Sequence, residues 1–68
     1  MFKFSDIKVS DILVANNTNA SEYKVLRAAK QEDIYYFCVE NLETKVESNI
    51  HVREGTEAKF GLAKIVHA

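Results

Sequence analysis

Few residues in this chain are of the types that carry out nucleophilic chemistry. The single cysteine, Cys38, lies between Phe37 and Val39 in the most apolar run of the sequence, and apolar surroundings disfavour the thiolate that attacks or binds metal. A cysteine nucleophile also needs a base beside it. The two histidines are His51, in an amphipathic segment, and His67, near the C-terminal end. Since neither position predicts contact with a core cysteine, we expect Cys38 to act as a small hydrophobic residue and we expect no catalytic residues.

Histidines and carboxylates are also the residue types that bind zinc. On a strand, however, His51 and Glu54 point to opposite faces, so their spacing does not bring them to one ion, and His67 is far away in the sequence. Glu54 and Glu57 flank Gly55 in what reads as a solvated turn. No two carboxylates are placed together in an apolar pocket, as acid–base catalysis requires. We therefore expect no metal, no cofactor and no enzymatic activity.

Two consecutive tyrosines, Tyr35 and Tyr36, are the only positive sign of a binding surface. Neighbouring strand residues point to opposite faces, so one of the two rings is expected to be exposed. An exposed tyrosine gives rigid contact area to a protein or stacks on a base; the alternative is a ring that packs along the sheet with its hydroxyl in water. Lys24 and Arg27 lie on the preceding segment and would add phosphate contacts. The candidate binding residues are Tyr23, Lys24, Arg27, Tyr35, Tyr36, His51 and Arg53.

The composition predicts one small folded domain over residues 1–68. Hydrophobic residues make up 47% and charged residues 28% of the chain, which is typical of a globule rather than of a disordered segment. A chain of this length buries only roughly 60% of its unfolded surface, so a partner or a second copy would add stability. The nine basic and ten acidic residues are mixed along the sequence, which disfavours non-specific binding to DNA or to lipid.

The cysteine content and the N-terminus indicate where the protein works. A lone cysteine excludes an internal disulfide, as expected in a reducing compartment. The N-terminus has no apolar signal region, and no run of residues is long and apolar enough to span a membrane. The sequence therefore predicts a cytoplasmic protein without membrane contact.

Turn-forming residues divide the chain into short segments that are rich in β-branched and aromatic residues. The clearest loop is 16–21, with further breaks at 31–33, 41–44 and 54–57. The five expected strands are residues 11–15, 21–30, 34–40, 45–53 and 59–67, preceded by an irregular or one-turn segment at 4–10. The expected core residues are Ile7, Val9, Ile12, Val14, Val25, Phe37, Val39, Val46, Ile50, Phe60, Leu62 and Ile65.

The second segment is the one whose structure the pattern leaves open. Residues 21–31 contain a helix N-cap candidate, Ser21, followed by good helix formers. The apolar positions Tyr23, Leu26 and Ala29 make only a thin helical stripe, whereas a strand would pair with the next run as a hairpin. We favour the strand; the alternative fold is α+β, with 21–31 helical on a small antiparallel sheet. The same two structures are open for 56–68.

At this point the sequence resembles a known class of domains. The run Asp11-Ile12-Leu13-Val14, a polar loop, Tyr23-Lys24-Val25-Leu26, and a strand that leads into Asn41-Leu42-Glu43-Thr44 resemble the small SH3-like β-barrels of short bacterial and phage proteins, over about residues 7–66. Similar sequences have glycine at two positions where this chain has Ser10 and Lys45. The resemblance implies a five-stranded barrel that binds a peptide, a nucleic acid or a partner protein.

We therefore expect a non-enzymatic protein–protein interaction module, which the resemblance extends to a small phage-encoded inhibitor or modulator of a host factor. The alternative is a barrel that binds RNA or single-stranded DNA through Tyr35 or Tyr36 with Lys24 and Arg27. A second copy that pairs along a strand edge would give a homodimer.

Overall fold

The computed structural model describes residues 2–68 and is all-β. A short 3-10 turn, η1 (Phe4–Asp6), leads into β1 (Ile12–Ala15), β2 (Glu22–Gln31), β3 (Ile34–Asn41) and β4 (Glu47–Arg53), and a second 3-10 turn, η2 (Glu57–Lys59), precedes β5 (Leu62–Val66). The strands form one antiparallel sheet in the order β4-β3-β2-β1-β5. The edge strands β4 and β5 do not pair with each other, so hydrogen bonds do not close the sheet. The all-β prediction is confirmed, and the α+β alternative is wrong.

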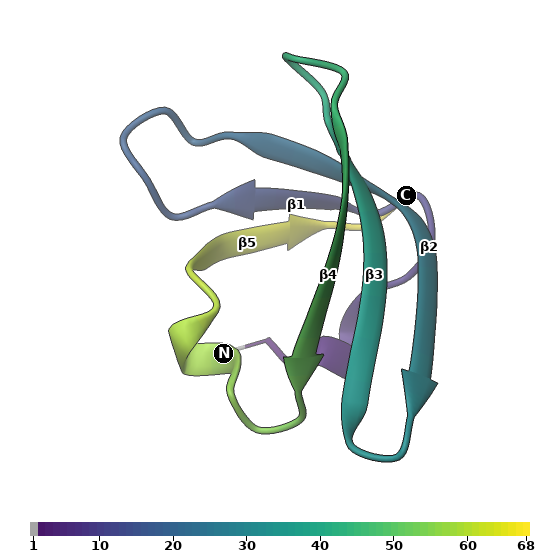
Figure 1. The fold of residues 1–68 in the computed structure, drawn as a ribbon. Helices are drawn as coiled ribbons and strands as arrows, with labels where there is room; N and C mark the ends of the chain where they lie inside the picture. Colours follow the sequence, from purple (N-terminus) through teal and green to yellow (C-terminus); the bar gives the residue numbers. More distant parts are fainter. Residues whose placement is uncertain (1) are drawn as a thin grey trace.

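Residues 21–31 form a strand because a tight turn returns the chain onto it. Glu32 adopts a φ of +57°, the left-handed conformation that two-residue hairpin turns require, and Gln31 pairs directly with Ile34. The first part of β2 also pairs with β1, from Glu22 to Lys24. In Figure 1, β2 bends from the layer of β1 and β5 into the layer of β3 and β4, and the strands of the two layers cross each other. The sheet is thereby curled around its inner face.

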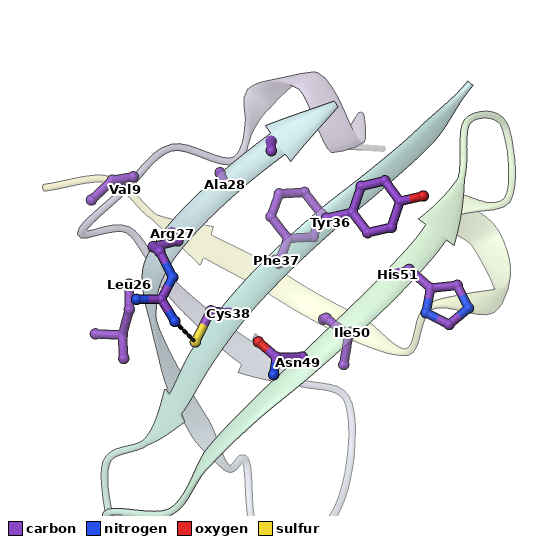
Figure 2. Close-up of a pocket in the computed structure, with 11 residues that line it drawn as sticks. Val9, Leu26, Arg27, Ala28, Tyr36, Phe37, Cys38, Asn49, Ile50 and His51 are labelled. Carbon is purple, nitrogen blue, oxygen red and sulfur yellow. Dashed lines mark hydrogen bonds between the residues drawn. The ribbon is translucent and has the colours of Figure 1, made fainter. Parts of the chain in front are cut away.

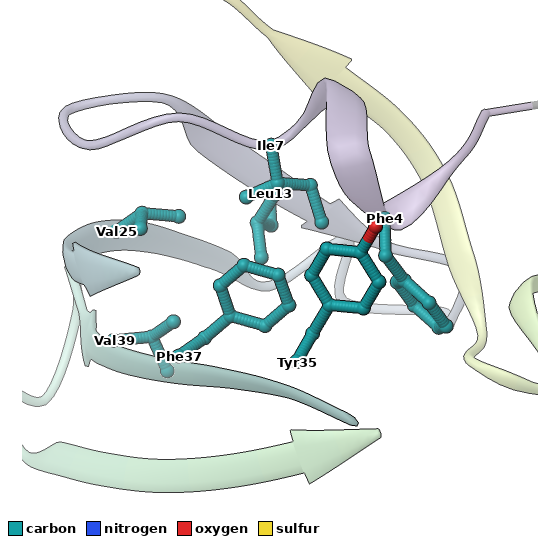
Figure 3. Close-up of a cluster of buried hydrophobic side chains, with 7 residues drawn as sticks. All are labelled: Phe4, Ile7, Leu13, Val25, Tyr35, Phe37 and Val39. Atoms are coloured by element: carbon teal, nitrogen blue, oxygen red, sulfur yellow. The ribbon is translucent and has the colours of Figure 1, made fainter. Parts of the chain in front are cut away.

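The core lies on that inner face and consists mainly of aromatic and β-branched side chains. Phe4 and Val25 are the most completely buried of them, and the Phe4 ring meets the rings of Tyr35 and Phe60 at centroid distances of 5.8 and 5.1 Å. Figure 3 shows the central cluster, which is Phe4, Ile7, Leu13, Val25, Tyr35, Phe37 and Val39. Of the expected core residues, Ile7, Val14, Val25, Phe37 and Val39 are buried, and Ile50, Phe60, Leu62 and Ile65 pack against the cluster.

Three of the expected core residues lie elsewhere. Val9 and Val46 are 54% and 59% exposed, because Val9 lies in a turn of the N-terminal segment and Val46 precedes β4, outside the strand whose alternation predicted its burial. Ile12 is only half-buried, since Leu13 is the β1 residue that joins the central cluster. The sequence pattern missed Leu13 and placed Phe4 at the end of the core rather than within it.

Ser10 and Lys45, the two positions at which the resemblance to SH3-like barrels predicts glycine, adopt the backbone conformation that favours glycine. Ser10 has a φ of +78° and Lys45 a φ of +63°, a region that costs a residue with a Cβ roughly 1–2 kcal/mol. Ser10 turns the chain before β1, and Lys45 closes the turn before β4 with its N–H on the Asn41 carbonyl at 2.7 Å. The turns therefore keep the geometry of a glycine without the residue that suits it.

Candidate binding surface on the outer face of the sheet

The two adjacent tyrosines point to opposite faces, as predicted, and only one of them reaches solvent. Tyr36 is 44% exposed, whereas Tyr35 is 7% exposed. The Tyr35 ring stacks on Phe37 at 6.0 Å, and its hydroxyl lies 3.4 Å from Glu54 Oε1. Tyr35 was predicted to be a binding residue, but its ring is held in the core. Only Tyr36 therefore offers its ring to a partner.

Tyr36 lies in the middle of a surface that we call the outer face: Arg27, Ala29, Tyr36, Cys38, Asn49 and His51, from β2, β3 and β4. Cross-strand pairs place these side chains on one side of the sheet, because Tyr36 is opposite Ala29 and His51 while Cys38 is opposite Arg27 and Asn49. They line a groove of about 530 Å³. Figure 2 shows the Tyr36 and His51 rings beside each other, and their centroids are 6.3 Å apart. The groove thus has an aromatic side, next to the small side chain of Ala29.

Cys38 is a free, buried residue on this outer face rather than in the central cluster. Its Sγ lies 3.5 Å from Arg27 Nη2, the contact that Figure 2 marks with a dashed line. His51 is opposite Tyr36 and not opposite Cys38. Across residues 2–68, no group of three or more histidine, cysteine or carboxylate side chains is arranged to hold a metal ion.

The remaining predicted residues do not join Tyr36. Lys24 is exposed, but its row across the sheet continues with Glu40 and Glu47. Arg53 is 3.6 Å from Asp33 Oδ2, at the far end of β4. Tyr23 is on the inner side, where it lines a different groove with Leu13 and Phe60. Of the predicted site, the outer face therefore unites Arg27, Tyr36 and His51.

A further groove, of about 490 Å³, lies beside β2 on the inner side, and sequence reasoning missed it. Ala28, Ala29 and Val9 line both this groove and the one on the outer face. Lys8 and Lys30 add positive charge to it. Two consecutive alanines in a strand were the available signal, since small side chains leave the backbone of a strand accessible.

Three ionisable side chains are tied into the backbone or to each other near these grooves. Lys30 Nζ donates to Glu54 Oε1 at 3.3 Å, and this bond, with the nearby Tyr35 hydroxyl, raises the pKa of Lys30. Glu57 accepts the Phe4 N–H at 3.1 Å, which lowers the pKa of that carboxyl. These bonds secure the end of the sheet at which the N-terminal segment packs.

The third, Asp11, fastens both ends of the chain beside β2. Its Oδ2 accepts the Lys8 N–H at 2.8 Å and lies 2.9 Å from His67 Nδ1, and its Oδ1 accepts the Ala68 N–H at 3.2 Å. Burial by itself would raise the pKa of the Asp11 carboxyl, but these bonds outweigh it and hold that pKa below its ordinary value. The segment that carries Lys8 and Val9 is thereby held next to the groove.

Comparison with known proteins finds no family model, no curated protein and no solved structure that matches this chain. Nowhere in residues 2–68 is there a helix of the length and apolar character that crossing a bilayer would take. The surface itself is thus the basis on which function is argued.

Proposed function

We propose that this chain is a non-enzymatic protein-interaction domain, a five-stranded SH3-like β-barrel that binds its partner through the outer face. The observation that carries the proposal is Tyr36, an aromatic residue left 44% exposed in the groove while the aromatic residues on either side of it, Tyr35 and Phe37, are buried. Interfaces draw much of their binding energy from a few such aromatic anchors that fill or border a pocket. Leu26 and Val9 add apolar surface at the opposite end of the groove from Tyr36, near Arg27, as Figure 2 shows.

The rim of the groove suits a protein partner. Arg27, Asn49 and His51 surround the apolar centre with hydrogen-bonding groups, the arrangement of an apolar core within a polar rim that protein interfaces share. The resemblance to small phage proteins extends the proposal to a host factor as the partner, in a cytoplasmic setting.

RNA or single-stranded DNA is the second candidate, favoured by one observation: His51 lies beside an exposed aromatic ring on which a base could stack, and Arg27 lines the same groove. A strand of nucleic acid also needs a continuous row of cations for its phosphates. On this face Glu40 and Glu47 interrupt the row next to Lys24. The mixed charge supports the protein partner.

The test is affinity capture from an extract of the source organism, with and without nuclease, using the wild-type chain, Tyr36→Ala and Val46→Ala. Val46 is the control because it is also an exposed apolar residue, with 59% of its surface accessible, and it lies away from the groove, just before β4. We expect a protein that wild type and Val46→Ala retain after nuclease treatment and that Tyr36→Ala loses. Capture that disappears with nuclease, or that is equal for the Tyr36 variant, would refute the proposal.

A further inference from the structure

The second half of β2 has a free edge. Residues 22–24 of β2 pair with β1, whereas residues 27–31, after the bulge at Leu26, pair with β3 alone. At the branch point, Val25 directs its N–H and its carbonyl towards the β1 side, to the Asp11 carbonyl at 2.9 Å and the Ser10 N–H at 2.8 Å. Beyond Val25, the segment that precedes β1 turns away from β2. Within the described part of the chain, no other strand pairs with this side of β2.

The free edge presents specific backbone groups. In an antiparallel pair, every second residue directs both its N–H and its carbonyl away from the partner strand. The two-residue turn makes Gln31 and Ile34 a hydrogen-bonded pair, so Lys30 and Ala28 direct their backbone groups away from β3, and Ala29 directs its groups towards β3. Counting from Val25 across the bulge at Leu26 gives the same assignment. Ala28 and Lys30 are therefore the residues with backbone groups free for another strand.

Both faces of this edge are grooved, and each groove has a basic side chain in its lining. The outer groove and the inner groove, of about 530 and 490 Å³, share Val9, Ala28, Ala29 and Phe37. Arg27 lines the first, and Lys8 and Lys30 line the second, while no carboxylate lines either one. Because Lys30 is bonded to Glu54, Arg27 and Lys8 are the cations that the grooves offer to an anion. Alternate side chains of an added strand would enter the two grooves in turn.

We propose that an extended, acidic segment of a protein partner adds to residues 26–31 of β2 as a further strand. Ala28 and Lys30 supply the backbone hydrogen bonds, and carboxylates of the segment meet Arg27 and Lys8. This mode of recognition takes its affinity from the main chain and its specificity from the pockets for alternate side chains. The inference rests on the proposed function and defines how the partner of that same surface binds.

A second copy of this chain is a poorer occupant of the edge. Two β2 edges brought together would place the Arg27, Lys8 and Lys30 of one copy near those of the other, and like charges across a strand pair are destabilising. A partner with carboxylates removes that repulsion. The edge therefore favours a different, acidic chain over self-association.

The test uses two fluorescein-labelled nonapeptides: one has pairs of consecutive glutamates between valines, so that carboxylates face both grooves, and the matched one has lysine in place of every glutamate. We expect the glutamate peptide to bind, with an affinity that falls as salt is raised, and the lysine peptide not to bind. In amide hydrogen exchange of the complex, the Ala28 and Lys30 amides should slow at least tenfold relative to the free protein. The Ala29 amide is the internal control, because its bond to β3 is present in both states.

Variants separate the edge from the charge. Ala28→Pro removes a free donor without removing a β3 bond, and it should abolish binding; Lys8→Glu should weaken binding about fivefold, with Lys45→Glu, on a turn remote from both grooves, as its matched control. The charge pair and the exchange data decide the question even if Ala28→Pro does not fold. Equal binding of the two peptides, no slowing at Ala28 and Lys30, or slowing in the free protein that grows with its concentration would each overturn the proposal. None of these results depends on the Tyr36 capture experiment, so the two failures are distinguishable.

Discussion

Replacement of Asp11 by alanine should destabilise the fold far more than the equivalent change at Asp6. Both aspartates accept the N–H of the residue three positions earlier, Asp11 from Lys8 at 2.8 Å and Asp6 from Lys3 at 3.0 Å. Asp6 is exposed, whereas Asp11 is the only charged side chain buried within residues 2–68. The pair therefore compares a buried aspartate, which also contacts His67 and Ala68, with an exposed one that accepts the same kind of N–H bond.

The magnitude follows from the donors that Asp11→Ala leaves behind. A buried donor without an acceptor costs roughly 1–3 kcal/mol. The Lys8 N–H is such a donor, and the Ala68 N–H, near the end of the chain, can bind water instead. We expect Asp11→Ala to lower the free energy of unfolding by about 2 kcal/mol, which in a domain of this size lowers Tm by about 10 °C. Asp6→Ala should change the free energy by less than about 0.5 kcal/mol.

The same carboxylate should make stability depend on pH in acid. Its folded-state pKa is held below the ordinary value, which is about 3.9 in an unfolded chain. Its contribution is therefore fully present above that value and is lost as the pH falls through the folded pKa. Urea unfolding at pH 7 and at pH 3 should show a smaller acid loss in Asp11→Ala than in wild type. Equal destabilisation by the two alanine variants, or an unchanged acid loss, would refute the role given to Asp11.

Three further outcomes follow from the described geometry. Lys45→Gly and Ser10→Gly should each raise the free energy of unfolding in urea by about 0.5 kcal/mol, since glycine relieves the positive φ but loses more chain entropy; a loss of stability would contradict this. Cys38 should react with a thiol reagent at least roughly tenfold more slowly in the native protein than in urea, because the residue is 5% exposed, and equal rates would contradict its burial. By circular dichroism, Phe4→Ala should unfold most of the protein, at roughly 3–5 kcal/mol, and Tyr36→Ala should change stability by about 0.5 kcal/mol or less; comparable losses would show that Tyr36 is structural.

The sequence predicted the strands in which the side chains show a clear hydrophobic pattern. It failed where the conformation of a turn or of the backbone determines which residues are buried. The run around Tyr35 and Tyr36 has the composition of a central strand, and the structure makes it β3, with neighbours on both sides. Val46 was assigned to the core because the alternation was continued past the start of β4, and Val9 because the irregular segment before β1 was expected to cover one end of the core. The turns that expose them depend on positive φ values at Ser10 and Lys45, which are not residues that predict such a conformation.

The candidate site shows the same division. The opposite orientation of the tyrosines follows from strand geometry alone, but which ring is buried depends on the curl of the sheet around Phe4. The bulge at Leu26 has no signal, because Val25-Leu26-Arg27 reads as an uninterrupted strand. Ala28 was not predicted as a site residue because its methyl side chain carries no functional group. Its backbone groups, however, are among those left free at the edge.

The bulge links the core of this fold to its open edge. Before it, Val25 faces the core; after it, Ala28 is opposite Phe37 on the inner side and Arg27 is opposite Cys38 on the outer face. If Leu26 were paired regularly with Cys38 instead of bulged, the alternation would turn Arg27 inward, opposite Phe37, and Ala28 outward. Bulges also bend a strand. This bulge lies where β2 stops pairing with β1, so Leu26 keeps Arg27 on the outer face at the same point at which β2 loses its neighbouring strand. An edge left open in this way invites pairing with any extended chain, and the cations Lys8, Arg27 and Lys30 beside it disfavour a second copy while they attract an acidic segment.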